Sequence, residues 1–337
     1  RMKITAMTLN IPDVFRAEMS GEMTNLTDSL KRTGNVTLSA EAGNMDFIKA
    51  LTGGFVIPHG TKLNADAQLN GSRAETNVAL IPLQAGRMSF SGDYDMLSED
   101  YKAVLSIDTL DLHTFLPQDS LYKVIAKVEA EGKGFDFFST RTYGTLKGDL
   151  FRLEYGHRRY SDVSLFANIK ECNAIADLNI NDYVARFDAH LTALLHPSRV
   201  SAELTADLQR LKLMSMGITA KECTPSLHLE ARAGSDMKKH HGVRVSVTDI
   251  RVKTEKQSFK TKDLHAGLEL ATDSVRSFVN AGDLTFLFRS NTGWEHFMRD
   301  VDRYSAEVEK QWKKKVINQK LLQELLPDAR LRILAGA

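Results

Sequence analysis

The segment Lys62–Asn70, KLNADAQLN, alternates apolar and polar residues without interruption. In an extended chain its polar residues fall on one side, and the other side carries Leu63, Ala65, Ala67 and Leu69. This period of two residues is typical of an antiparallel strand that has one apolar face and one face in water. A strand of a parallel sheet, covered on both faces, is apolar at nearly every position. The segment therefore predicts an antiparallel sheet and argues against an α/β fold.

The same period recurs along most of the chain. Alternating runs occur at Arg87–Met96, Tyr101–Ile107, Val124–Ala130, Val163–Ile169, Ala174–Ile180, Val200–Leu208, Val243–Val247 and Leu284–Phe288. Short links that tolerate turn geometry separate neighbouring runs at Asn70-Gly71-Ser72, Ala85-Gly86, Asn181-Asp182 and Ala233-Gly234-Ser235. Strands joined by such links pair as hairpins. We therefore expect a mainly β chain that forms an elongated, curved antiparallel meander.

Helical spacing is confined to two segments. Asn44–Leu51 predicts a short helix that Gly53 and Gly54 end. Near the C-terminus, Thr292 and Glu295 predict a capping box at the start of a long amphipathic helix, and Pro327 ends that helix. Its apolar residues recur near helical spacing, and we expect one side of it to pack on the sheet through Trp294, Phe297, Val301, Tyr304, Val308 and Trp312.

The domain organisation follows from these patterns. A Gly-Asp pair followed by an apolar residue recurs at positions 92–94, 148–150 and 282–284, which indicates degenerate internal repeats. Residues 1–290 are expected to form the repetitive groove, and residues 291–326 the helix that packs on it. Residues 327–337 then form the start of a further strand that is truncated. The chain begins abruptly with a strand pattern, which indicates a piece of a longer protein.

Composition excludes several classes of protein. The chain of 337 residues is 42% hydrophobic and 26% charged, which is typical of a folded protein rather than a disordered one. Its net charge of +1 gives no electrostatic reason to expect nucleic acid as a partner. Cys172 and Cys223 are too few for a disulfide-rich scaffold or a four-cysteine zinc site, and leave open one bridge or two free thiols. No apolar run approaches the ~20 residues of a membrane-spanning helix.

The chain shows no catalytic motif. HExxH, GxSxG, GxxxxGK[ST] and GxGxxG are all absent. His240 and His241 follow two lysines in a polar segment, for which a solvated loop is favoured over a metal site. The acidic residues fall mostly on the polar sides of strands. We therefore expect neither an enzyme nor a cofactor or a metal.

A sheet with a single apolar face has to cover that face. It can close into a sandwich or barrel, or it can curve into a trough filled by a helix and by acyl chains. Each CH₂ removed from water contributes about 0.8 kcal/mol, so an acyl chain of about 15 carbons gains on the order of 12 kcal/mol. The residues expected to line such a trough are Leu63, Leu69, Met88, Phe90, Tyr94, Leu105, Ile107, Val124, Val128, Leu165, Phe187, Leu191, Val243, Val245, Phe286 and Phe288.

One stretch resembles the repeat unit of a known family. Ser91–Pro117, SGDYDMLSEDYKAVLSIDTLDLHTFLP, resembles the repeat of the TamB and AsmA-like envelope proteins, with two alternating strands, an Asp-Leu step and a Phe-Leu-Pro end. Glu131–Asp136 and Leu325–Pro327 are similar to Bacteroides-type TamB chains. The resemblance implies an open hydrophobic groove of the β-taco kind in the periplasm, with phospholipid acyl chains as its cargo. It also implies an inner-membrane anchor outside this chain, and a BamA-like outer-membrane partner.

Other functions stay open at this point. The chain resembles proteins linked to phospholipid transport between the two membranes, but the same groove or its edges suit an assembly factor for outer-membrane β-barrel proteins. An extracellular adhesin or carbohydrate-binding module would carry exposed aromatics on a flat face. Here the aromatic residues mostly share the apolar face, which makes that class the least favoured. An ordinary closed core is the structural alternative to a groove.

Overall fold

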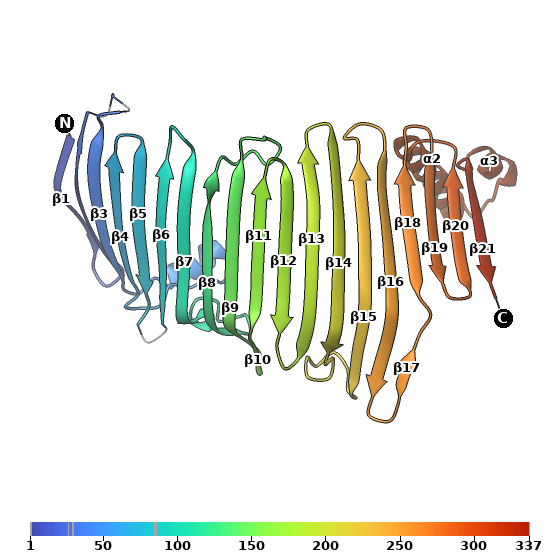
Figure 1. Ribbon diagram of the computed structural model, residues 1–337, viewed down its shortest axis with the longest axis horizontal. Helices are drawn as coiled ribbons and strands as arrows, with labels where there is room; N and C mark the ends of the chain where they lie inside the picture. Colours follow the sequence, from blue (N-terminus) through green and yellow to red (C-terminus); the bar gives the residue numbers. More distant parts are fainter. Residues whose placement is uncertain (1, 26, 29, 84–85, 337) are drawn as a thin grey trace. The chain divides into compact units, whose positions relative to one another are not determined.

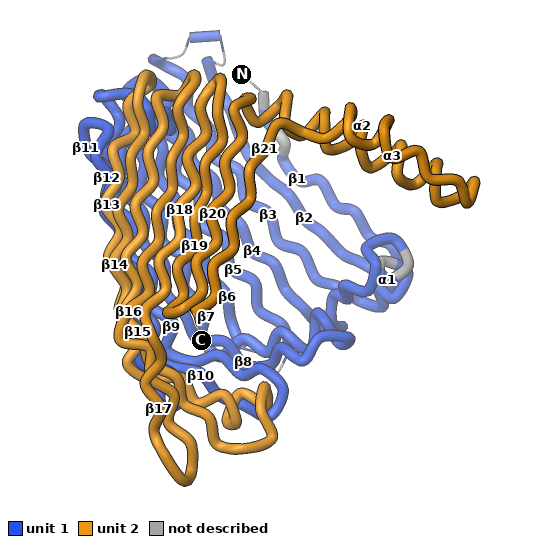
Figure 2. The backbone as a smooth tube through the Cα atoms, turned by 90° about the vertical axis from the view of Figure 1, so that its right-hand side faces the viewer, with its two compact units in different colours: residues 1–187 blue, residues 188–337 orange. Residues whose placement is uncertain are grey.

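The computed structural model describes residues 2–25, 27–28, 30–83 and 86–336. The predicted fold class is confirmed. The described chain is 60% strand, and its 21 strands form an antiparallel sheet that does not close. A long helix lies near the C-terminus. The chain divides into two compact units, residues 1–187 and 188–337, which Figure 2 colours separately. The position 290 that separates the expected groove from the helix lies within the second unit.

Unit 1, residues 1–187, is built from strands that follow one another in chain order (Figure 1). They are β1 (Met2–Ile11), β2 (Phe15–Thr24), β3 (Thr33–Ala42), β4 (Lys62–Asn70), β5 (Arg73–Ile81), β6 (Arg87–Asp95), β7 (Asp100–Asp111), β8 (Leu121–Lys133), β9 (Tyr143–Tyr155), β10 (Arg158–Tyr160), β11 (Val163–Lys170) and β12 (Asn173–Asn181). Each pairs antiparallel with its neighbour in the chain, except that β10 and β11 both pair with β9, and β11 then pairs with β12. The helices of this unit, among described residues, are α1 (Phe47–Thr52) and the short 3-10 turn η1 (Leu112–Thr114).

The register of unit 1 places its apolar residues in continuous rows across the strands. Residues opposite one another in antiparallel neighbours share one face. One row runs through Leu63, Leu80, Met88, Ile107, Ala126, Leu150, Val163 and Ile180. The next runs through Leu38, Ala65, Val78, Phe90, Leu105, Val128, Gly148, Leu165 and Leu178. Unit 1 therefore has one apolar face that extends from strand to strand.

Unit 2, residues 188–337, repeats this design. It contains most of β13 (Ala185–His196), then β14 (Arg199–Leu211), β15 (Cys223–Ser235), β16 (His241–Thr254), β17 (Ser258–Lys260), β18 (Leu264–Leu270), β19 (Val275–Ala281), β20 (Leu284–Ser290) and β21 (Ala329–Ala335). An apolar row crosses it through Leu204, Ala231, Val245, Ala266, Val279, Phe286 and Ile333. The helices α2 (Trp294–Lys314) and α3 (Gln319–Glu324) lie between β20 and β21.

The long helix differs from the expected one in two ways. It breaks at Lys315, whose φ of 52° is left-handed, so that α2 and α3 replace one continuous helix. The predicted capping box is wrong: Gly293 is the residue at the N-cap, and no side chain caps the helix. The Thr292 hydroxyl is instead 2.9 Å from the Ser290 hydroxyl, which itself donates to the Asp328 carbonyl. A hydroxyl held by the strand end is not available to the helix.

One predicted turn lies inside a strand. Ala233-Gly234-Ser235 is not a turn but the end of β15, and Gly234 lies opposite Gly242 of β16. The chain turns in the next residues, where the Asp236 carboxylate accepts hydrogen bonds from the backbone N–H groups of Lys238, Lys239 and His240. The chain therefore reverses in a turn held by the Asp236 side chain, and not at Gly234 as predicted. The predicted turn at Ala85-Gly86 lies partly outside the described residues.

Little of either sheet is buried. The accessible surface is 21995 Å², whereas a monomer of this mass exposes about 14,000 Å². The buried apolar residues of the described chain are Ala40, Ala42, Leu110, Phe115, Val124, Cys172, Val184, Ala206 and Val275. Most apolar side chains in the rows are half-buried by their neighbours in the same sheet. No described helix is both long and apolar enough to span a membrane.

Candidate functional site

Ten of the sixteen predicted lining residues lie on the apolar face of unit 1. The cross-strand register brings together Leu63, Met88 and Ile107 in one row, and Phe90, Leu105, Val128 and Leu165 in the next. A further row contains Leu69, Ala74, Tyr94 and Tyr101. Val124 lies opposite Leu110 and Leu153 beyond a β-bulge, and it is buried. The expected grouping of these residues on one face is what the structure shows.

The remaining predicted lining residues lie elsewhere. In unit 2, Val245 and Phe286 share a row, and Val243 and Phe288 share the adjacent one with Leu268. Phe187 and Leu191 both belong to β13 and are half-buried. Fourteen of the sixteen candidate residues therefore fall on the apolar faces of two separate units.

A hollow of about 570 Å³ opens on the apolar face of unit 1. Its lining is almost wholly apolar and comes from β2 to β8 and the loop that follows β8. The apolar lining consists of Met23, Gly34, Val36, Ala67, Leu69, Ala74, Phe90, Gly92, Tyr94, Tyr101, Ala103, Ala130 and Phe135, and Thr76 adds a methyl group and a hydroxyl. The hollow is therefore an apolar space that unit 1 offers to a ligand.

The floor of the hollow exists because small residues coincide in neighbouring strands. Ala67 lies opposite Thr76, which lies opposite Gly92. Gly92 in turn lies opposite Ala103, and Ala103 opposite Ala130. Elsewhere on this face, side chains of the size of leucine and phenylalanine stand over the same sheet. A run of small residues across five strands therefore leaves space for an apolar ligand.

Aromatic rings form one wall of the hollow. Phe135, in the loop after β8, stacks on Tyr101 with ring centroids 4.9 Å apart and lies 6.1 Å from the ring of Tyr94. Phe135 is 63% exposed, so much of its ring remains available. Gly134 precedes it with a φ of 69°, a conformation that glycine adopts at little cost and that turns the chain back over the sheet.

The opposite face of unit 1 is polar and carries ion pairs. Asp93 accepts a hydrogen bond of 2.7 Å from the Arg73 guanidinium, and Lys102 lies 3.6 Å from Glu131. The ammonium group of Lys127 contacts Glu129, and its hydrogen bond and charge lower the pKa of that carboxyl group. Each of these residues precedes or follows one that belongs to the apolar rows. Charged and apolar residues therefore alternate along each strand, so that one face of the sheet is charged and the other is apolar.

Phe135 and Tyr101 were not among the predicted lining residues. Tyr101 belongs to a predicted strand and falls on its apolar side, so its place in the hollow was within reach of the period-two pattern. Phe135 lies outside the strands, and its position depends on the path of the loop. The small residues of the floor carry no sequence signal of their own, because alanine and glycine are common in strands and turns alike.

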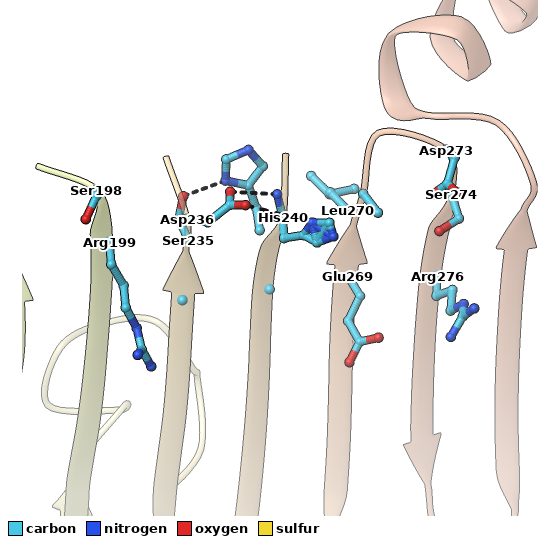
Figure 3. A pocket seen from close by; sticks show the side chains of 14 residues that line it. Ser198, Arg199, Ser235, Asp236, His240, Glu269, Leu270, Asp273, Ser274 and Arg276 are labelled. Atoms are coloured by element: carbon cyan, nitrogen blue, oxygen red, sulfur yellow. Dashed lines mark hydrogen bonds and ion pairs between the residues drawn. The ribbon is translucent and has the colours of Figure 1, made fainter. Parts of the chain in front are cut away.

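A second hollow, of about 640 Å³, lies at the loop ends of β14 to β19 in unit 2 (Figure 3). Its polar groups hold the turn between β15 and β16. Hydrogen bonds from three backbone N–H groups lower the pKa of Asp236 well below its usual range. The Ser235 hydroxyl lies 2.7 Å from Nδ1 of His241. His240 and His241 are exposed, and no three metal-ligating side chains gather anywhere in the described chain.

The helix residues expected to pack on the groove are spread along α2. Phe297, in the first turn, meets Phe288 of β20 edge-on with ring centroids 5.2 Å apart, and Trp294 lies 6.2 Å from Phe297. Val301 and Tyr304 are half-buried, and Val308 is 36% exposed. Trp312, in the last turn, is 79% exposed. Figure 2 shows α2 and α3 extending away from the strands of their own unit. Contact with the sheet of unit 2 is made by the first turn of α2.

The two cysteines are free thiols. Cys172 is buried in the turn between β11 and β12, and Cys223 begins β15. The bridged alternative is therefore not the one that the structure contains.

Comparisons with protein-family models, with curated proteins and with solved structures found no match to this chain. What the protein does has to be inferred from its sequence and from the geometry of its sheets.

Proposed function

We propose that the apolar face of the sheet binds the acyl chains of phospholipids. The chain would then be a hydrophobic-groove segment of a TamB/AsmA-like protein that carries phospholipid through the periplasm between the inner and outer membranes. The observation that supports this most directly is the hollow of about 570 Å³ on unit 1, floored by small residues and walled by Phe90, Tyr94, Tyr101 and Phe135. The resemblance of Ser91–Pro117 to the repeat of that family supports the same function.

The energetics suit a carrier better than a storage site. A methylene group gains about 0.8 kcal/mol on leaving water, whether it enters a bilayer or an apolar hollow. Exchange of an acyl chain between membrane and sheet is therefore nearly neutral, while escape into water is strongly opposed. An open face permits such exchange along the rows, because no covering layer has to move away first.

An ordinary closed core fits unit 1 less well. Such a core needs a second layer over the apolar face. Within the described residues of unit 1, the elements other than strands are α1 and η1, of 6 and 3 residues. Apolar side chains of this face remain accessible, among them Met7 at 55%, Leu9 at 48% and Leu165 at 37%.

Site-specific photo-crosslinking in cells tests the proposal. A photoreactive residue at Phe90 or Leu105 lies on the apolar face and should label phospholipid. Ser91 and Ser106 are the matched controls, because each is the next residue of the same strand and points to the polar face. Lipid adducts at Phe90 and Leu105 but not at Ser91 and Ser106 are the expected result. Crosslinks to protein alone at all four positions would contradict the proposal.

A space-filling substitution provides a second test. Ala103→Phe places a ring on the floor of the hollow, where its cross-strand neighbours are Gly92 and Ala130. We expect this variant to fold and to retain less phospholipid on purification, as measured by mass spectrometry. Ala167→Phe is the control, because Ala167 lies on the same face, opposite Ala176, outside the hollow.

A second candidate function is assembly of outer-membrane β-barrel proteins together with a BamA-like partner. The observation that favours it is the continuous apolar row across unit 1, against which the apolar side of a nascent barrel strand can pack. Purification from cells separates the two functions: retained phospholipid favours transport, and a retained outer-membrane protein favours assembly.

A further inference from the structure

The polar face of unit 2 carries a row of arginines. Arg276 of β19 lies directly opposite Arg289 of β20, and Arg289 lies directly opposite Arg330 of β21. Arg332, two residues further along β21, falls on the same face opposite Leu287. We call these four residues the arginine row. They are separated by up to 56 residues in the sequence, and the antiparallel register alone brings them together.

The arginine row has no counter-charge of its own. Within the described part of the chain, none of its four guanidinium groups makes an ion pair or a side-chain hydrogen bond with a carboxylate. Glu269, opposite Arg276, is already bound by Arg244 at 2.6 Å, and Asp328, two residues before Arg330, lies 3.4 Å from the amide of Asn291. Figure 3 shows Glu269 and Arg276 on neighbouring strands. Like charges directly opposite one another destabilise a sheet. Three in succession therefore indicate a site that an external anion completes.

A hollow of about 390 Å³ lies among these arginines. Its floor contains Gly267, over which the ring of Phe278 lies: a Cβ atom at Gly267 would be 2.8 Å from Cζ of Phe278. Phe278 in turn lies opposite Leu287. All four arginines of the row line this hollow, together with Glu269. The site is therefore a concave basic surface rather than a flat one.

The spacing of the row suits a pair of phosphate groups. Neighbouring strands are about 4.8 Å apart, so the three opposed arginines span on the order of 10 Å. A guanidinium group presents its donors as a planar fork that matches phosphate, and two forks can hold one phosphate between them. We propose that the arginine row binds a ligand with two adjacent phosphate groups, whether a soluble diphosphate or a bisphosphorylated lipid headgroup. This site lies on the opposite face from the apolar rows and does not depend on the proposed transport of acyl chains.

Calorimetric titration of the full chain with inorganic pyrophosphate at low salt tests the site. The variant R289Q/R330Q removes the two central charges of the row. The control R232Q/R251Q removes the same number of charges from exposed arginines of unit 2 that pair with Glu203 and Asp249. We expect the affinity to fall at least tenfold in the first variant and less than twofold in the control. R289K/R330K keeps the charge without the fork and should lie between them.

Two readouts separate the possible results. Vesicles of cardiolipin, a lipid with two phosphates, should bind with the same dependence on the row if the ligand is membrane-borne, and should not bind if it is soluble; either result supports the site. The melting temperature of R289Q/R330Q should not fall, because the substitutions relieve repulsion. If both double variants lost pyrophosphate affinity equally, the loss would be due to net charge alone, and the proposal would be overturned. Absence of pyrophosphate and vesicle binding by the unmodified chain would overturn it as well.

Discussion

Phe135 stacks on Tyr101 with ring planes 14° apart, although Phe135 belongs to a loop and is 63% exposed. The pair joins the end of β8 to β7 and closes one side of the apolar hollow on unit 1. The relationship leads to the first of four predictions.

Phe135→Ala should weaken binding of an apolar fluorescent probe to unit 1 severalfold, because it removes the wall of the hollow. Unfolding in urea should change little, since an aromatic pair contributes about 0.5–1.5 kcal/mol and this ring is mostly exposed. Phe137→Ala is the matched control, because Phe137 is in the same loop, is 50% exposed and does not line the hollow. Equal probe binding in both variants would contradict the role of Phe135.

Gly132→Ala should destabilise the chain by about 1–3 kcal/mol, the usual cost of overpacking. A Cβ atom there would overlap the carbonyl oxygen of Tyr143 and lie 2.6 Å from Cα of Gly144 and 2.8 Å from the Tyr101 hydroxyl. Gly148→Ala is the control on the neighbouring strand, where the nearest atom would be 3.8 Å away. Urea unfolding followed by circular dichroism measures both variants. A loss at Gly148 as large as that at Gly132 would show that the close approach is not the cause.

Phe297→Ala should destabilise the chain, whereas Trp312→Ala should leave its stability almost unchanged. Phe297 packs edge-on against Phe288, so its loss should cost about 2–3 kcal/mol, at or below the lower end of the range for buried phenylalanine. Trp312 is 79% exposed, and its truncation should change the free energy of unfolding by less than about 0.5 kcal/mol. Differential scanning calorimetry on the two variants measures this. A large loss in Trp312→Ala would mean that the last turn of α2 packs against the chain in solution.

His228 should make the stability of the chain depend on pH. Its Nδ1 atom lies 2.7 Å from Asp207 and its Nε2 atom 3.5 Å from Glu230, and the hydrogen bond with Asp207 is the main cause of a raised pKa. Because the folded state favours the imidazolium, its contribution is fully present below about pH 6.5, the pKa of an unfolded histidine. The contribution is lost as the pH rises through the raised pKa.

The difference in melting temperature between the unmodified chain and His228→Gln measures this contribution. It should be largest near pH 5.5 and should shrink towards pH 8.5. His265→Gln is the control, because the partner of His265 is the neutral hydroxyl of Ser246 at 3.0 Å. A difference that stays constant with pH would rule out a charged pair at His228.

The period-two pattern was sufficient to predict the strands in which it is uninterrupted, together with their faces. Lys62–Asn70 is β4 with the predicted bounds, and its four apolar residues lie on the apolar face. This works because successive side chains of a strand point to opposite faces whatever the strand pairs with. The short helix near Phe47 was predicted for a similarly local reason, since Gly53 adopts the left-handed conformation that ends it.

Errors arose where a residue had a competing partner. Thr292 was expected to cap a helix, but its hydroxyl contacts Ser290 at the end of β20. Gly234 was expected in a turn, but the carboxylate of Asp236 organises the turn two residues later. Both outcomes depend on hydrogen bonds between residues two to four positions apart, which compete with the expected cap and turn, so the residue pattern alone does not choose between them.

By itself, the sequence determined that the chain would form antiparallel strands with one apolar and one polar face, because alternation is a property of each strand alone. Only the tertiary structure decided which residues of different strands stand side by side. The small residues from Ala67 to Ala130 make a hollow, and Arg276, Arg289 and Arg330 make a charged row, because of the register between strands. Register depends on turn lengths and β-bulges, and a slip of one residue would move every such side chain to the other face.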